Sequence, residues 1–170
     1  TNTICQGDST TLIANGANTY VWSPSNSLNQ SSGNIVIANP SVTQNYTVIG
    51  TDLNLCESTV NYQVSILNNP TISISSTNDT ICVGDVVNLS ANGAVSYVWS
   101  PATSLNVTTG STVSAMPTMT TNYSVTGISS ENCITTLNKS ILVNPLPSLS
   151  INSNSFIICE DSSISLIAVG

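Results

Sequence analysis

The sequence predicts an all-β protein made of tandem immunoglobulin-like β-sandwich domains, and three observations support this fold class. The 170 residues are 5% charged and 40% hydrophobic with a mean hydropathy of +0.22, which is too apolar for a disordered chain. Abundant Thr, Val, Ile and Ser favour strands, and no window keeps a helical spacing of apolar residues over three turns. The chain also repeats itself, which decides the architecture.

The repeat needs no gaps. Its period is 77, the difference in number between Cys5 and Cys82 and again between Cys82 and Cys159. The other matched positions include Cys56 and Cys133, Trp22 and Trp99, Pro40 and Pro117, and Tyr46 and Tyr123. This period is too long for a solenoid unit but long enough for a small sandwich. We therefore expect an N-terminally incomplete sandwich over 1–69, a complete one over 70–147 and the start of a third over 148–170, all part of a longer array.

In the complete copy, short runs of strand-forming residues alternate with turn signals, which is typical of an antiparallel sandwich. The expected strands are Thr71–Ser76, Val86–Ala91, Ser96–Ser100, Thr112–Ala115, Asn122–Gly127 and Thr136–Val143. Gly84 and Gly93 provide turns between them, and Pro145 and Pro147 stiffen the linker that follows. We expect the two ends of each domain to lie on opposite sides, so that successive domains form a head-to-tail rod.

The charge composition excludes several functions. Eight acidic residues against the single Lys139 give a net charge of −7, which leaves no basic surface for nucleic acid. The chain has no His, and no apolar run approaches the roughly 20 residues of a membrane helix. Single carboxylates that recur once per period, Asp8 and Asp85, make neither a calcium cage nor a glycosidase pair. We expect no cofactor, no metal site, no membrane insertion and no enzymatic activity.

The large aromatic residues are expected in the sandwich cores. Trp22 and Trp99 each follow a Tyr by two positions, so strand alternation puts both rings on the same face. Tyr46 and Tyr123 stand at the head of a later strand and are expected as tyrosine corners, whose hydroxyl bonds to nearby backbone. The alternative for the Trp face is a platform that stacks sugar rings, which requires that face to be open.

The recurring residues read Ile-Cys-x-Gly-Asp, then Leu, Tyr-x-Trp-Ser-Pro, Pro, Tyr and Cys. They are Ile4, Cys5, Gly7, Asp8, Leu12, Tyr20, Trp22, Ser23, Pro24, Pro40, Tyr46 and Cys56, with their partners one period later. This pattern covers essentially the whole chain and resembles the immunoglobulin-like and PKD-like tandem repeats of giant Bacteroidota cell-surface adhesins, in particular gliding-motility adhesins of the SprB type. The resemblance implies type IX secretion, display on the bacterial cell surface and a role in adhesion or gliding motility.

Two short segments suggest modification. Asp-Ser-Thr at 8–10 and Asp-Thr-Ile at 79–81 are similar to the O-glycosylation motif of Bacteroidota. Ser9 and Thr80 are therefore candidate sugar acceptors. The many Asn-x-Ser/Thr sequons carry less weight, because a chain this rich in Asn, Ser and Thr produces them by chance.

Two functions from different classes fit the sequence. The first is a non-catalytic structural repeat of a long extracellular adhesin or filament, whose partners are neighbouring repeats of the same chain or lateral copies of itself. The second is a glycan-binding β-sandwich module, whose partners are surface glycans. The residues that match between copies fall on expected core positions, turn glycines, prolines and cysteines rather than on one group of loops, which favours the structural function.

Five cysteines at fixed spacing in an extracellular protein predict disulfides. Pairing within a repeat gives Cys5–Cys56 and Cys82–Cys133, but in a seven-strand sandwich these loops lie at opposite ends, about 20 Å apart. A disulfide needs Cα atoms within about 7 Å. In a rod the two loops of successive domains meet, which makes Cys5–Cys133 the leading pair and leaves Cys82 and Cys56 to cysteines outside the sequence. If the two loops of one repeat instead lie at the same end of the sandwich, the within-repeat pairing becomes the expected one.

Overall fold

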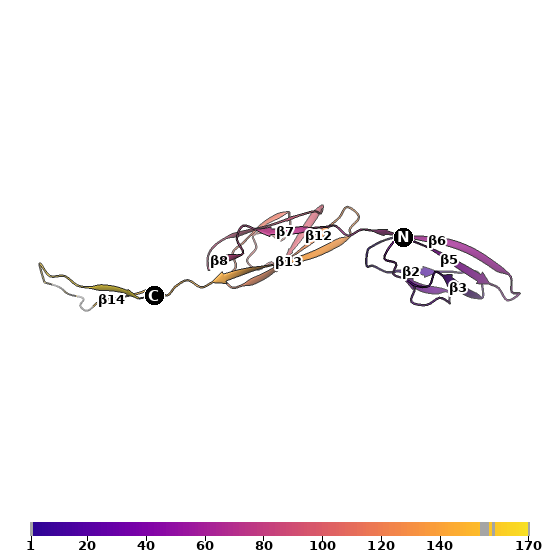
Figure 1. Cartoon of the computed structure of the whole chain (residues 1–170), viewed down its shortest axis with the longest axis horizontal. Helices are drawn as coiled ribbons and strands as arrows, with labels where there is room; N and C mark the ends of the chain where they lie inside the picture. The colour runs from indigo at the N-terminus through magenta and orange to yellow at the C-terminus, as the bar shows by residue number, and fades with distance from the viewer. Residues whose placement is uncertain (1, 154–156, 158, 170) are drawn as a thin grey trace.

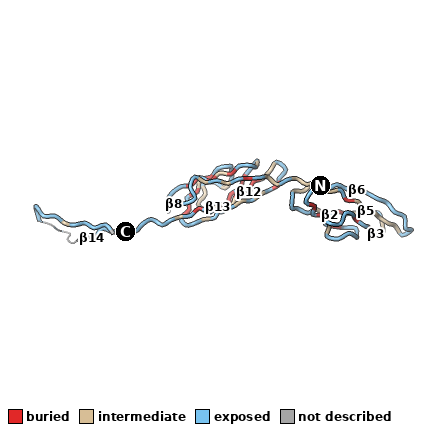
Figure 2. The backbone as a smooth tube through the Cα atoms, in the orientation of Figure 1, coloured by how far each residue is buried: buried red, intermediate tan, exposed pale blue. Residues whose placement is uncertain are grey.

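The computed structural model describes residues 2–153, 157 and 159–169. They form two β-sandwiches and a separate hairpin, arranged end to end along one axis (Figure 1). We call the sandwiches repeat 1 (2–67) and repeat 2 (70–144). Buried residues lie inside the two sandwiches, and the terminal hairpin is largely exposed (Figure 2). The described residues contain no helix, and hence none able to cross a membrane.

Repeat 2 has two sheets packed face to face. The first sheet has the order β11-β9-β7, with β7 at Ser73–Ser76, β9 at Val87–Asn92 and β11 at Thr112–Ala115. The second has the order β10-β12-β13-β8, with β8 at Thr80–Cys82, β10 at Ser96–Ser100, β12 at Thr121–Ile128 and β13 at Ile134–Asn144. The chain crosses from the first sheet to the second after β7, because β7 pairs with β9 whereas β8 runs parallel to β13.

Repeat 1 has the same strands one period earlier, with one exception. Its larger sheet has the order β1-β6-β5-β3, with β1 at Thr3–Cys5, β3 at Thr19–Ser23, β5 at Gln44–Thr51 and β6 at Glu57–Leu67. Its smaller sheet pairs β2 (Thr10–Ile13) with β4 (Ile35–Ala38). The positions equivalent to β7 fall before Thr1, so β2 has no outer neighbour among the described residues.

The expected third repeat, 148–170, is described at 148–153, 157 and 159–169. β14 (Ser150–Ser153) pairs antiparallel with β15 (Leu166–Val169) in a hairpin. Ser150 pairs with Val169, which is the register of Ser73 with Asn92 in repeat 2, displaced by one period. β14 is therefore the counterpart of β7, and β15 lies on it as β9 lies on β7.

Two short strands, β1 and β8, are absent from the strands expected from sequence. Each is a Thr-Ile-Cys segment that pairs in parallel with the last strand of its own repeat. A three-residue strand shows too little alternation to be recognised as a period of two. Ile81 is nonetheless buried in the core of repeat 2, and Ile4 packs against that of repeat 1.

Each sandwich has its own core around one Trp. Trp22 is 4% exposed and Trp99 is 2% exposed. The indole Nε1 of Trp22 donates a hydrogen bond to the carbonyl of Gly33 at 2.8 Å, and that of Trp99 to the carbonyl of Gly110 at 2.9 Å. Both Trp rings are thus enclosed and their only polar atom is satisfied. A sugar-stacking platform would need these rings to face solvent, and they do not.

Tyr46 and Tyr123 are fully buried, but their hydroxyls differ from the expectation. The Tyr46 hydroxyl pairs with the Ser27 hydroxyl at 2.6 Å, and that of Tyr123 with Ser104 at 2.5 Å. The predicted hydrogen bond to nearby backbone is therefore wrong for these two residues. The tyrosine that does bond to backbone in repeat 2 is Tyr97, whose hydroxyl accepts from the amide of Ala94 and donates to its carbonyl.

Replacing Trp99 by Ala should destabilise repeat 2 by about 3–5 kcal/mol, because a fully enclosed indole leaves a large cavity. The control is Val98→Ala on the same strand, whose side chain is exposed on the opposite face and should cost within about 0.5 kcal/mol. Urea denaturation followed by circular dichroism measures both. Equal effects of the two substitutions would contradict the enclosed position of Trp99.

Candidate functional site

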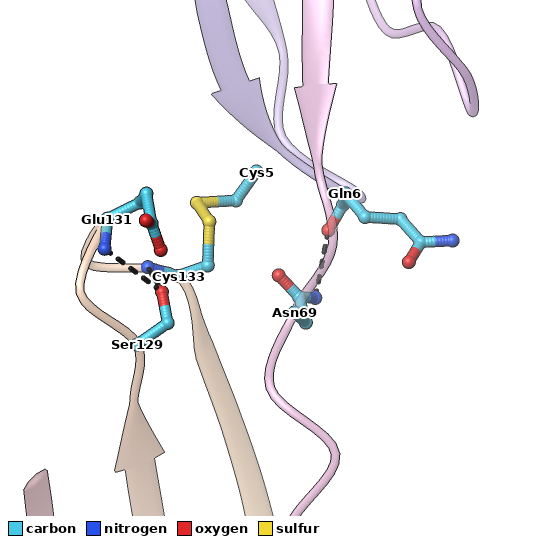
Figure 3. Close-up of a disulfide and its surroundings, with 6 residues drawn as sticks. All are labelled: Cys5, Gln6, Asn69, Ser129, Glu131 and Cys133. Atoms are coloured by element: carbon cyan, nitrogen blue, oxygen red, sulfur yellow. Dashed lines mark hydrogen bonds between the residues drawn. A yellow bond between two sulfur atoms is a disulfide. The ribbon is translucent and has the colours of Figure 1, made fainter. Parts of the chain in front are cut away.

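The candidate site is the junction between the two repeats, where the sequence predicts the Cys5–Cys133 disulfide. Cys5, at the end of β1, forms a disulfide with Cys133 of repeat 2, with the sulfur atoms 2.01 Å and the Cα atoms 5.5 Å apart (Figure 3). The two cysteines are separated by 128 residues. We call this bond the clasp. The alternative pairing within repeats, Cys5–Cys56 and Cys82–Cys133, is wrong.

The strand topology explains why the clasp joins different repeats. β1 runs parallel to β6, so Cys5 lies beside Leu67, where the chain leaves repeat 1. Cys56 directly precedes β6, at the other end of a strand of 11 residues. At about 3.3 Å per residue, the two cysteines of repeat 1 are on the order of 30 Å apart along that strand, far beyond disulfide reach.

The loop that carries Cys133 is held in place by Ser129. The Ser129 hydroxyl accepts hydrogen bonds from the amides of Glu131 at 3.2 Å and Cys133 at 3.1 Å. Backbone bonds close the same turn, from the Ser129 amide to the Cys133 carbonyl and from the Asn132 amide to the Ser129 carbonyl. Asn132 has a φ of 66°, which Asn tolerates well. Cys133 is thus 1% exposed and presented in a fixed geometry.

Repeat 1 builds the same loop with a carboxylate in place of the hydroxyl. The Asp52 carboxylate accepts hydrogen bonds from the amides of Asn54 at 2.8 Å and Cys56 at 2.9 Å. The hydrogen bond from the Cys56 amide, aided by those from Asn54, holds the pKa of Asp52 below its ordinary value, although desolvation opposes this shift. Cys56 is exposed and is not disulfide-bonded to any described residue.

The short linker between the repeats (68–69) and the residue after it form hydrogen bonds with both repeats. The Gln6 amide donates to the Leu67 carbonyl at 2.8 Å, and Asn69 Nδ2 donates to the Gln6 carbonyl at 3.0 Å (Figure 3). On the other side, the Thr135 hydroxyl donates to the Pro70 carbonyl at 2.7 Å. Asn69 Oδ1 is buried without a hydrogen-bond partner. The role of Asn69 could not be predicted from the sequence, because its counterpart one period later is Leu146 and no repetition marks the position.

The charged groups of the junction are few. Glu131 lies beside Cys133 and is exposed; hydrogen bonding by the Ser130 hydroxyl, followed by its own backbone amide, lowers its pKa. The ion pair found among the described residues joins Lys139 of β13 to Asp79 at 2.7 Å, away from the clasp. Hydrogen bonding from Lys139 and from the Ser76 hydroxyl lowers the pKa of Asp79. No group of three or more potential metal ligands occurs in the described ranges.

The two candidate sugar acceptors differ in their surroundings. Ser9 is exposed in the turn between β1 and β2, and Thr80 is exposed at the start of β8. They are not equivalent, since the counterpart of Ser9 is Val86 and that of Thr80 is Thr3. The acid of the second motif, Asp79, is engaged by Lys139. Glycosylation at either residue remains a prediction.

Lowering the pH should weaken the hydrogen bonds that Asp52 accepts in the loop of repeat 1, whereas the Ser129 hydroxyl that holds Cys133 in repeat 2 carries no charge to lose. Because folding lowers the pKa of Asp52, its stabilising contribution is present above the ordinary pKa of about 3.9 and is lost as the pH falls through the lowered value. NMR titration should move the Asn54 and Cys56 amide signals together with the Asp52 carboxyl. The matched variant Asp52→Ser copies Ser129 and should keep the loop while removing this titration. An Asp52 pKa at or above its ordinary value would contradict the two hydrogen bonds.

Comparisons with known proteins find weak similarities to solved structures. No protein-family model and no curated protein matches the chain. Among solved structures, it is similar to the amphioxus IgVJ-C2 molecule at 16% identity, covering 82% of this chain and 99% of that one, with a TM-score of 0.37. It is similar to murine CEACAM1b at 14% identity, covering 85% and 96%, with a TM-score of 0.36.

A third similar structure is the insect immune protein hemolin, at 14% identity, covering 84% of this chain and 44% of that one, with a TM-score of 0.37. Hemolin has a domain arrangement with implications for homophilic adhesion. These TM-scores are too low to carry an argument about fold or function. The two packed sheets, their strand order and the enclosed Trp of each repeat show that the chain consists of immunoglobulin-like β-sandwich domains.

Proposed function

We propose that the chain is a non-catalytic structural segment of an extracellular rod, in which each sandwich is clasped to the next. The observation that carries this proposal is the Cys5–Cys133 disulfide, which joins two domains rather than closing one. The bonds of Asn69 and Thr135 to the chain around the linker restrain the same junction without covalent help. A junction fixed from several sides is what a rod needs to transmit orientation from domain to domain.

The same bond supports an extracellular location. Structural disulfides persist in oxidising compartments, and the near absence of charge suits a surface that varies little with salt. The resemblance to Bacteroidota repeats supports the finer proposal of a bacterial cell-surface adhesin of the gliding-motility type, exported by type IX secretion. Neighbouring repeats of the same chain are then its principal partners, with lateral copies as a second class.

The glycan-binding alternative loses its main support in the structure. That alternative required Trp22 or Trp99 to present an open face, and both are enclosed. A glycan array probed with the whole chain tests whether it binds sugars through some other surface. A saturable signal for one class of sugar would favour binding over a purely structural function, and its absence would leave the rod as the simpler proposal.

Breaking the clasp should loosen the junction without unfolding either repeat. In Cys5→Ser and in Cys133→Ser, the cores around Trp22 and Trp99 are untouched, so both repeats should keep their native circular dichroism. Spin labels at exposed Val21 and Val98, one on each repeat, should give a broader distance distribution than in the oxidised chain.

The matched control is Cys159→Ser, whose thiol is exposed and lies outside both sandwiches. It should leave the distance distribution unchanged. Chemical reduction of the unsubstituted chain should reproduce the effect of Cys133→Ser. If the distribution stays equally narrow without the disulfide, the clasp does not fix the junction, and the rod must be maintained by the linker alone.

A further inference from the structure

The outer face of the smaller sheet in repeat 1 carries a group of exposed apolar side chains. Ile13 of β2 is 60% exposed, and Ile35 and Ile37 of β4 are 48% and 45% exposed. Ile13 lies directly opposite Ile35 in the antiparallel pair, and Ile37 follows two residues later on the same face. Side chains in these relations are neighbours on the sheet surface. We call these three residues the isoleucine patch.

Repeat 2 builds the same sheet face from polar residues. One period later, the three positions are Ser90, Thr112 and Ser114, and the strands keep the same register. The hydroxyls of Ser90 and Thr112 pair at 3.3 Å, and the Ser114 hydroxyl donates to Asn88 Oδ1 at 2.7 Å. The sandwich therefore does not need isoleucine at these positions. A single exposed apolar residue requires no explanation, but three adjacent ones mark a surface that meets something.

The patch is exposed because of strand alternation. Leu12 and Val36 on the same two strands point inward and are buried, so the isoleucines point away from the core. In repeat 2, β9 has β7 beside it, yet Thr112 is exposed and Ser90 is partly exposed. A strand at the sheet edge thus leaves this face uncovered.

The outer edge of β4 is closed by the loop that precedes this strand. The Ile37 amide donates a hydrogen bond to Asn29 Oδ1 at 2.7 Å, and the Ile37 carbonyl accepts one from the Asn29 amide at 3.0 Å. Gln30 Nε2 donates to the Ile35 carbonyl at 3.0 Å. These bonds occupy the groups that another strand would pair with. A partner must therefore pack on the face of this sheet rather than extend it beside β4.

The charge distribution favours another copy of the chain as the partner. No charged residue occurs from Ser9 to Thr51, a stretch that includes β2 and β4. Copies with a net charge of −7 repel one another, and a face without charges is where they can approach most closely. A charged partner would find nothing to pair with here. A sugar would find neither a flat ring nor a hydrogen-bonding group on the isoleucines.

We propose that the isoleucine patch is the contact through which two copies of the chain pack side by side, patch against patch. A two-fold axis brings the same face of both copies together, so the patch needs to match only itself. Sheets packed face to face lie about 10 Å apart, and the side chains of both inner faces fill that space. This inference rests on the proposed function, because it names the surface through which lateral copies of the rod meet.

A single contact of this kind is weak. Three partly exposed isoleucines are a fraction of the roughly 800 Å² that each partner buries in a standard interface. We expect a Kd on the order of 1 mM for two free copies. Rods held side by side on one surface face each other at an effective concentration of about that order, so the contact would form there.

Methyl NMR of the whole chain over a range of concentrations tests the contact. The methyl signals of Ile13, Ile35 and Ile37 should shift as the concentration rises, whereas that of Ile141, enclosed in repeat 2, should not. In a mixture of isotope-labelled and unlabelled copies, nuclear Overhauser effects should join the patch methyls of one copy to those of the other. Shifts confined to other residues would contradict the proposal.

The decisive variant copies repeat 2 into repeat 1. Ile13→Ser, Ile35→Thr and Ile37→Ser together introduce the residues that the same sheet face already carries one period later, so repeat 1 should stay folded. They should weaken association roughly 10-fold or more in the same titration. The matched control is Val21→Thr, which is 55% exposed on the outer face of the larger sheet of repeat 1 and should leave association unchanged.

Three outcomes would overturn the proposal. If Val21→Thr weakens association as much as the triple substitution, the copies adhere without specificity. If association survives the triple substitution, it uses another surface. If the patch signals stay fixed up to the highest soluble concentration, the patch does not bind a second copy. None of these substitutions touches Cys5 or Cys133, so the clasped rod, tested by the spin-label distances, stands or fails separately.

Discussion

The parallel pairing of β1 with β6 determines where the two ends of each repeat lie. This pairing spans three residues, from Thr3 with Ser65 to Cys5 with Leu67, and it is repeated by β8 on β13. Because of this pairing, the first strand of each repeat ends beside the C-terminal residues of its last strand. The first cysteine of each repeat therefore lies at the end where the chain leaves the repeat. The second cysteine lies at the opposite end, where the chain enters it. A disulfide within one repeat is impossible in this topology, and a disulfide between successive repeats becomes a short-range contact.

The sequence was a good guide wherever repetition and strand period agreed. It placed Trp22 and Trp99 in the cores, it predicted an all-β sandwich, and the end-to-end argument favoured Cys5 with Cys133. It was a poor guide where a feature is short or unrepeated. The three-residue strands β1 and β8 carry no readable period. The hydroxyl partners of Tyr46 and Tyr123, which are Ser27 and Ser104, depend on packing between segments 19 residues apart and follow from no local signal.

The two repeats show which parts of the domain can change without changing the scaffold. The cores match closely, whereas the oxygen that holds the last loop is a carboxylate at Asp52 and a hydroxyl at Ser129. Both oxygens accept the same two amide hydrogen bonds, so the position of the following cysteine is kept. Lys139, by contrast, stands where repeat 1 has Tyr62, and its exposed ion pair with Asp79 contributes little stability. What is maintained is the geometry of the junction rather than the chemistry of the surface.

The clasp also changes the route by which mechanical tension would travel. A pull applied before Cys5 and after Cys133 passes through the sulfur–sulfur bond, and the intervening chain, a loop with a sequence separation of 128, carries no load. Nearly all of repeat 1 and strands β7 to β12 of repeat 2 belong to that loop. Unravelling of the chain inside the loop would therefore add nothing to the distance between those two points. Without the disulfide, the chain between these two points would lengthen severalfold on unfolding under load; with it, the distance between Cys5 and Cys133 stays fixed.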